Sequence, residues 1–151
     1  MTKSLSLVAL AVAAQIGHAQ APACSNATLN GAYGVTISGL RPAPNVLFNF
    51  PALPGTIEQV IGVAIQIFDG AGNFTQTDNV KGSLSGITPD RAGSGTYTVN
   101  SHCTGSFTLN NAGAPFPIVT KIMIVDGGNE FRAAVVSPQA VMVTSNGRKM
   151  H

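Results

Sequence analysis

Glu130 and Arg132 are the pair of opposite charges whose spacing most directly suggests chemistry, because residues two apart in a strand project from the same face. Lys121 lies on the stretch expected to pair with them through the Asp-Gly turn at 126–129. If that face lined an interior, the three residues with Tyr97 would form a polar cluster able to orient a ligand or shift a pKa. If it faced outward, they would be an ordinary cross-strand charge pair. We favour the outward arrangement, because few charges are available to keep the surface soluble.

Other reactive residue types do not occur at spacings that support catalysis or metal binding. His102 and His151 have no Cys, His or carboxylate at metal-ligand spacing. Asp69 and Asn73 flank a glycine turn, but they fall short of the oxygen ligands that calcium takes, so turn formation is the better interpretation. Ser94 stands between two glycines without the wider pattern of a nucleophile elbow. We therefore predict no catalytic residue, no metal and no cofactor.

The composition excludes two classes of protein. Charged residues make up 9% of the 151 positions, and 44% of the positions are hydrophobic. Disorder requires low hydrophobicity and high net charge, so a folded chain is expected. The lysines and arginines are scattered, without the clusters and stacking aromatic residues of a nucleic-acid-binding surface. A small apolar molecule is a better candidate partner than a nucleic acid.

The N-terminus has the pattern of a secretory leader. Lys3 is followed by an apolar run from Leu5 to Ile16 and by small residues that end at Ala19. The run is too short to span a bilayer, and no later stretch approaches the length of a transmembrane helix. We predict a bacterial signal peptide over 1–19, with cleavage after Ala21 or Ala23 as the alternatives, a single mature domain over 20–151, and a secreted or periplasmic location.

Export changes the interpretation of the two cysteines. In an oxidising compartment an even cysteine count indicates a disulfide, so we predict a bond between Cys24 and Cys103. Closing a loop of this length would stabilise the fold by about 4.5 kcal/mol in the chain-entropy model. Lipidation of Cys24 is the alternative, but Pro22 fits a lipoprotein signal poorly.

The mature chain is predicted to be all-β. Gly, Pro, Asn and Ser recur too often for a helical pattern to run ten residues. Asp-Gly turns at 69–73 and 126–129 favour hairpins. About eight strands are expected, at 33–38, 57–68, 74–81, 95–99, 103–109, 117–125, 130–136 and 141–144. Sequential hairpins in that number predict a single antiparallel barrel, or a flattened barrel or sandwich.

Two of the expected strands have distinctive faces. The strand at 57–68 is predicted to be long and central, because Ile61, Val63, Ile65 and Ile67 share one face. The strand at 117–125 is apolar on both faces except for Thr120 and Lys121, which predicts burial on both sides.

The irregular stretch from Leu40 to Gly55 carries four prolines and several apolar residues, among them Phe48 and Phe50. A loop of this length is uncommon without a role, so it is expected either to pack down as a plug or to act as a lid. We favour packing, and we include Phe48 and Phe50 with Tyr97, Lys121, Glu130 and Arg132 as candidate ligand-binding residues.

The pattern formed by Cys24, residues 28–34, 68–73 and 94–100, and Cys103 resembles a group of small secreted bacterial proteins of uncharacterised function. More distantly it resembles the eight-stranded barrels of allene oxide cyclases and dirigent proteins, and in outline the lipocalin-like barrels. The resemblance implies a barrel with an apolar lumen. No catalytic residue of those enzymes can be matched to this sequence, so the resemblance implies a fold and no activity.

These observations lead to two functional hypotheses. The first is a non-enzymatic secreted barrel that binds a small apolar molecule or serves as an envelope or extracellular interaction module. The alternative, implied by the resemblance, is a cyclase or isomerase acting on a lipid or phenolic intermediate, with Tyr97, Glu130 or Arg132 as polar guides.

Overall fold

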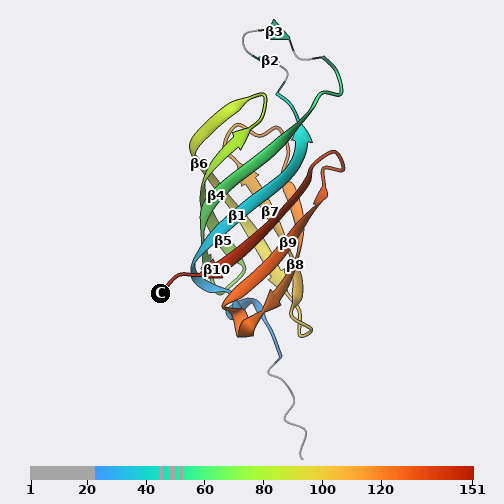
Figure 1. Cartoon of the computed structure of the whole chain (residues 1–151). Helices are drawn as coiled ribbons and strands as arrows, with labels where there is room; N and C mark the ends of the chain where they lie inside the picture. Colours follow the sequence, from blue (N-terminus) through green and yellow to red (C-terminus); the bar gives the residue numbers. More distant parts are fainter. Residues whose placement is uncertain (1–22, 45, 48–49, 52) are drawn as a thin grey trace, which may run out of the picture.

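The computed structural model describes residues 23–44, 46–47, 50–51 and 53–151, with the side chains of residues 46–47 and 50–51 left out. Eight antiparallel strands form a closed barrel, as the sequence predicts (Figure 1). The barrel strands are β1 (Asn30–Pro42), β4 (Ile57–Asp69), β5 (Asn73–Gly82), β6 (Gly86–Val99), β7 (Thr104–Asn111), β8 (Ile118–Val125), β9 (Glu130–Ser137) and β10 (Met142–Lys149).

The barrel has an up-and-down topology in which β1 closes the ring. From β4 to β10, each strand pairs with the next along the chain, and β1 pairs with both β4 and β10. Tyr33 in β1, for example, lies opposite Gln66 of β4 and Lys149 of β10. This closure gives each of the eight barrel strands two hydrogen-bonded neighbours.

The turn between β4 and β5 shows how side chains fix the hairpins. Asp69 Oδ1 accepts hydrogen bonds from the backbone N–H groups of Ala71, Gly72 and Asn73, and its Oδ2 accepts one from the Asn73 side-chain amide. The Asn73 side chain and these N–H groups lower the pKa of Asp69 to about 2. The carboxylate is thus occupied in building the turn, as the sequence predicts.

One end of the lumen is filled by aromatic rings. The inward-facing aromatic side chains are Tyr33, Phe68, Phe74, Tyr97, Phe107 and Phe131. Phe68 lies at their centre and contacts the other five rings at centroid distances between 5.2 and 5.9 Å. Glycines make room for them: a Cβ atom at Gly147 would collide with the Phe131 ring, and one at Gly95 would press on Phe74. We call this region the aromatic end.

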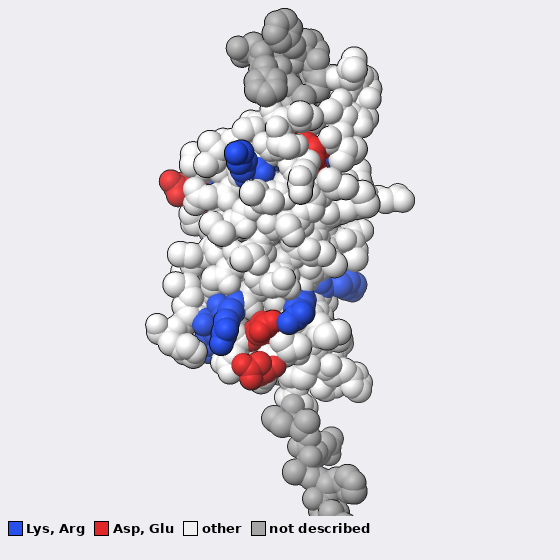
Figure 2. All heavy atoms as spheres, in the orientation of Figure 1, with Lys and Arg blue, Asp and Glu red and all other residues white. Residues whose placement is uncertain are grey.

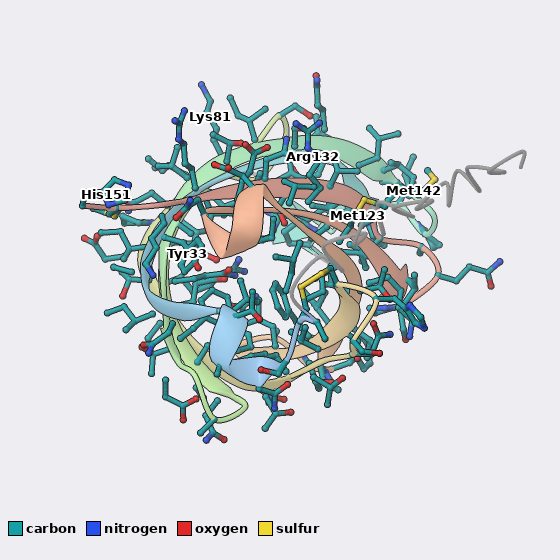
Figure 3. The ribbon with its side chains drawn as sticks, turned by 90° about the horizontal axis from the view of Figure 1, so that it is seen from below. Tyr33, Lys81, Met123, Arg132, Met142 and His151 are labelled. Carbon is teal, nitrogen blue, oxygen red and sulfur yellow. A yellow bond between two sulfur atoms is a disulfide. The ribbon has the colours of Figure 1, made fainter. Side chains whose placement is uncertain are left out.

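Short 3-10 turns and the disulfide cover the aromatic end. Figure 3 shows the turns η1 (Asn26–Thr28) and η2 (Asp126–Gly128), and the disulfide, across this end of the barrel. The predicted bond between Cys24 and Cys103 is confirmed. Leu29, directly after η1, is fully buried. The aromatic end is therefore closed from solvent by the first described residues of the chain.

Two tyrosines hold this cover by hydrogen bonds. The single Tyr97 O–H is shared between the carbonyl oxygens of Asn26 and Leu29, at 3.0 and 2.9 Å, and the Tyr33 hydroxyl donates to the Gly128 carbonyl. Burial raises the pKa of both phenols. The two hydroxyls therefore act as structural donors that satisfy buried backbone carbonyls.

The apolar face of β4 lies on the outside of the barrel. Ile61, Val63, Ile65 and Ile67 are each about half exposed (54, 57, 47 and 52%), whereas Ala64 and Phe68 of the same strand point inward. The prediction that 117–125 is buried on both sides is wrong, because a barrel covers only the inner face of a strand. Met123 in β8 is accordingly 55% exposed.

Charges are sparse on the outer surface. Figure 2 shows one face of the barrel, on which Lys, Arg, Asp and Glu gather toward the two ends and leave a broad uncharged band between them. In the described part of the chain, no helix has the length and hydrophobicity needed to cross a membrane.

Three strands are longer than the sequence predicts. Strand β6 begins at Gly86, nine residues before the expected start at position 95, and β10 ends at Lys149, five residues after the expected end at position 144. Strand β1 begins at Asn30 and continues to Pro42, into the predicted loop. That loop contains a small hairpin of β2 (Val46–Leu47) and β3 (Phe50–Pro51), which extends beyond the barrel in Figure 1. Packing of Phe48 and Phe50 lies outside the described residues, and Leu53 is 79% exposed.

Candidate functional site

The half of the lumen opposite the aromatic end contains a cavity of about 140 Å³, which is incompletely enclosed. We call this half the open end. Its apolar lining consists of Val35, Ile37, Val60, Phe74, Val80, Phe107, Leu109, Ile118, Val135, Val141 and Val143. Its polar lining consists of Arg41, Gln66, Gln76, Asp78, Arg91, Asn111, Thr120 and Ser145.

The cavity exists because the side chains that β9 and β10 present to the open end are short. An eight-stranded barrel has an interior just wide enough for side chains to fill it. At the aromatic end large rings meet across the axis, whereas at the open end β9 and β10 present Val135, Val143 and Ser145. These short side chains leave space between the walls, and the rings of Phe74 and Phe107 contribute to the lining below them.

A chain of polar side chains runs along one wall of the cavity. Arg91 donates from Nε and a terminal nitrogen to the two oxygens of Asp78, at 3.0 and 2.9 Å. Gln76 Nε2 donates to Asp78 Oδ2 at 2.7 Å, and Gln66 Nε2 donates to Gln76 Oε1 at 2.6 Å. All of these groups except Arg91 are at least nine-tenths buried.

The carboxylate at one end of this chain fixes the orientation of both amides. An ionised Asp78 only accepts hydrogen bonds, so Gln76 must present its NH2 group to it. The Oε1 atom of Gln76 then faces Gln66, which must present its own NH2 group in turn. The chain therefore ends at Gln66 Oε1, which is buried and receives no hydrogen bond from any described residue.

A second buried ion pair lies nearer the mouth of the open end. Arg41 Nε donates to Glu58 Oε1 at 2.8 Å, and the exposed fractions of the two side chains are 22% and 0%. Burial alone would raise the pKa of Glu58. Hydrogen bonds from the Ser85 N–H and hydroxyl, from Arg41 and from the Leu84 N–H outweigh that effect and lower the pKa. Glu58 is therefore held ionised.

The candidate residues from the sequence do not gather at this cavity. Glu130 and Arg132 form an outward pair at 3.0 Å, as we favoured, and Figure 3 shows Arg132 on the outside of the ring of strands. Lys121 is exposed and lies opposite Ala134 of β9, whereas Arg132 lies opposite Met123 of β8. Tyr97 is inside the barrel at the aromatic end. Phe48 and the Phe50 side chain lie outside what is described.

The polar wall itself was missed by sequence reasoning. Gln76 and Asp78 alternate with Thr75 and Thr77 in β5, and they share a face with Phe74. That alternation shows which residues share a face, but polar residues are usually assigned to the solvent side. The usable signal is that Phe74 and Val80 bracket them on the same face, so that burying the apolar pair also buries Gln76 and Asp78.

Within the described residues, no group of three or more His, Cys, Asp or Glu side chains is placed to hold a metal ion. Comparisons with protein-family models, with curated proteins and with solved structures find no match to this chain. The function is therefore inferred from the cavity and its lining.

Proposed function

We propose that this protein is a non-enzymatic binding protein that holds one small, largely apolar and uncharged molecule in the open end of its barrel. The observation that carries the proposal is the cavity of about 140 Å³, whose lining residues are apolar in the majority. Ligand sites are typically apolar cavities with a few well-placed polar groups, and barrel mouths are a common position for them.

The charges around the cavity favour a neutral ligand. Each described carboxylate in or beside the cavity is paired with an arginine, Asp78 with Arg91 and Glu58 with Arg41. A charged ligand would lose its hydration and would have to compete with an existing ion pair for a partner. An uncharged ligand avoids that cost and still gains from burial of its apolar surface.

The disulfide supports a location outside the cytoplasm. The bond between Cys24 and Cys103 persists in oxidising compartments and is rare where thiols are kept reduced. Together with the predicted leader over 1–19, which lies outside the described residues, this bond supports export to the periplasm or beyond. The cyclase or isomerase alternative gains no support from the site, since Glu130 and Arg132 face outward and Tyr97 is not part of the cavity lining.

A pair of matched variants tests the proposal. Val143 lines the cavity, and its neighbour Thr144 points to the outer surface. A panel of uncharged single-ring compounds is titrated into the wild type by calorimetry. The compound that binds is then tested with Val143→Phe, which fills the cavity, and Thr144→Phe, which adds the same ring outside. We expect at least tenfold weaker binding to the first variant and unchanged binding to the second.

Two results would overturn the proposal. One is a wild-type protein that binds no compound of the panel. The other is a folded Val143→Phe variant, verified by its melting transition, that binds as tightly as the wild type. Should Val143→Phe fail to fold, the wild-type titration still decides the question.

A further inference from the structure

One buried acceptor beside the cavity has no donor. Gln66 lines the cavity and is 6% exposed, and its Oε1 atom receives no hydrogen bond from any described residue. Buried polar atoms are almost always paired, so an exception in a ligand cavity points to a group that the ligand brings. The missing partner must be a hydrogen-bond donor, because a carbonyl oxygen only accepts.

Gln66 cannot remove this deficit by rotating its amide. A flip would place its Oε1 against Gln76 Oε1, the atom that now accepts the 2.6 Å hydrogen bond. Gln76 cannot flip in response, because its NH2 group is held by Asp78 Oδ2 at 2.7 Å. Asp78 is held in turn by two hydrogen bonds from Arg91. The ion pair thus keeps the Gln66 carbonyl oxygen without a donor from the described part of the protein.

The size of the cavity limits what can carry the donor. Its volume of about 140 Å³ is close to the roughly 150 Å³ of an apolar cavity that accommodates one benzene molecule. The rings of Phe74 and Phe107 and the methyl groups of Val35 and Val143 provide apolar walls. One six-membered ring with a small substituent matches this space.

We propose, building on the function proposed above, that the ligand is an uncharged single-ring alcohol or phenol whose hydroxyl donates to Gln66 Oε1. The hydroxyl completes the chain of polar side chains that runs from Arg91 through Asp78 and Gln76 to Gln66, while the ring fills the cavity. This chain therefore selects for a hydroxyl over an apolar substituent of similar size. A site built to accept a hydrogen bond disfavours an analogue that leaves its acceptor unpaired.

Phenol and toluene are suitable probes, because they differ only in a hydroxyl or a methyl group on the same ring. Water solvates phenol better than toluene, so an apolar cavity without an acceptor would prefer toluene. We expect the wild type to bind phenol more tightly than toluene in a calorimetric titration. The test variant is Gln66→Met, which keeps the length of the side chain and removes the amide. The control is Gln59→Met, at an exposed position on the outer face of the same strand.

In Gln66→Met we expect the ratio of the toluene to the phenol Kd to fall by about tenfold or more. In Gln59→Met the ratio should stay at the wild-type value. Equal or tighter binding of toluene by the wild type would overturn this inference and leave the proposed function standing. Failure of both compounds and of the wider ring panel would overturn the proposed function itself. If Gln66→Met does not fold, a wild type that binds toluene as tightly as phenol still overturns this inference.

Discussion

The two ends of the barrel differ in how the lumen between the eight strands is filled. At the aromatic end, Phe68 contacts five other rings and the backbone of η1 closes the barrel. At the open end, short aliphatic side chains line one part of the cavity and the Arg91–Asp78 pair lines another, with the Arg41–Glu58 pair nearer the mouth.

We infer from this difference that the aromatic end mainly stabilises the fold and that the open end is free to bind a ligand. Dense aromatic packing at one end supplies the dispersion and hydrophobic contacts that hold the barrel together. The open end contributes less packing and contains polar groups that are costly to bury without partners. Such groups are tolerated here because hydrogen bonds satisfy nearly all of them, and the remaining acceptor belongs to Gln66, a residue of the cavity lining.

Replacing Phe68 by Ala should give the largest loss of stability. The side chain is 1% exposed and surrounded by rings, so the cavity left behind would cost about 3–5 kcal/mol of unfolding free energy. Chemical denaturation of Phe68→Ala and of Val143→Ala would compare the two ends, and we expect the second to lose less than half as much. A matched control is Ile67→Ala on the outer face, which should change the stability by about 0.5 kcal/mol. Similar losses for Phe68→Ala and Val143→Ala would contradict the division into two ends.

Removing the disulfide should have the next largest effect. Cys24 and Cys103 are 79 positions apart, so the bond restricts a long loop of the unfolded chain and fixes the cover over the aromatic end. We expect the double variant Cys24→Ser/Cys103→Ser to lose about 2–4 kcal/mol in denaturant unfolding. An unchanged midpoint would show that η1 and the tyrosine hydrogen bonds hold the cover without the bond.

The buried pair at the mouth of the open end should matter less than the aromatic packing. Glu58→Gln leaves the Arg41 charge without its partner, but Arg41 is partly exposed and water can solvate it. We therefore expect a loss of about 1–3 kcal/mol at neutral pH. Glu130→Gln, in the exposed pair with Arg132, is the control and should change the stability by less than about 0.5 kcal/mol. Equal effects of the two substitutions would contradict the burial of the Glu58 pair.

Glu58→Gln should also change how the free energy of unfolding depends on pH. Because hydrogen bonds lower the pKa of Glu58 below its ordinary value of 4.5, its contribution is fully present above that pH and is lost as the pH falls through the folded-state pKa. Glu58→Gln should therefore lose less stability than the wild type between neutral pH and the acid range. Asp69, whose pKa is lowered from 3.8 to about 2, adds an acid dependence of its own that both proteins share. Parallel stability curves for the two proteins would contradict the assignment.

The sequence predicted the strands and hairpins well, because Asp-Gly turns and period-two alternation are local signals. It also predicted the disulfide from the cysteine count. It could not show which face of a strand points inward, since that depends on the partners brought together by closure. In β4, four apolar residues lie outside whereas Gln66 lies inside. The inner face of β4 is the one that carries Phe68, whose neighbouring rings Phe74 and Phe131 have room because Gly95 and Gly147 have no side chain. The polar wall was missed because Gln76 and Asp78 are stabilised by each other and by Arg91, and no single residue indicates that arrangement.

Phenol added to protein with labelled Ile, Leu and Val methyl groups tests directly, in one set of NMR spectra, whether the open end of the lumen is the binding site. We expect chemical-shift changes for the cavity methyl groups of Val35, Val60 and Val143. We expect none for Leu29 at the aromatic end or for Ile65 on the outer face. Changes concentrated on the outer face of β4, or no change in the lumen at saturating phenol, would show that the ligand does not bind in the open end.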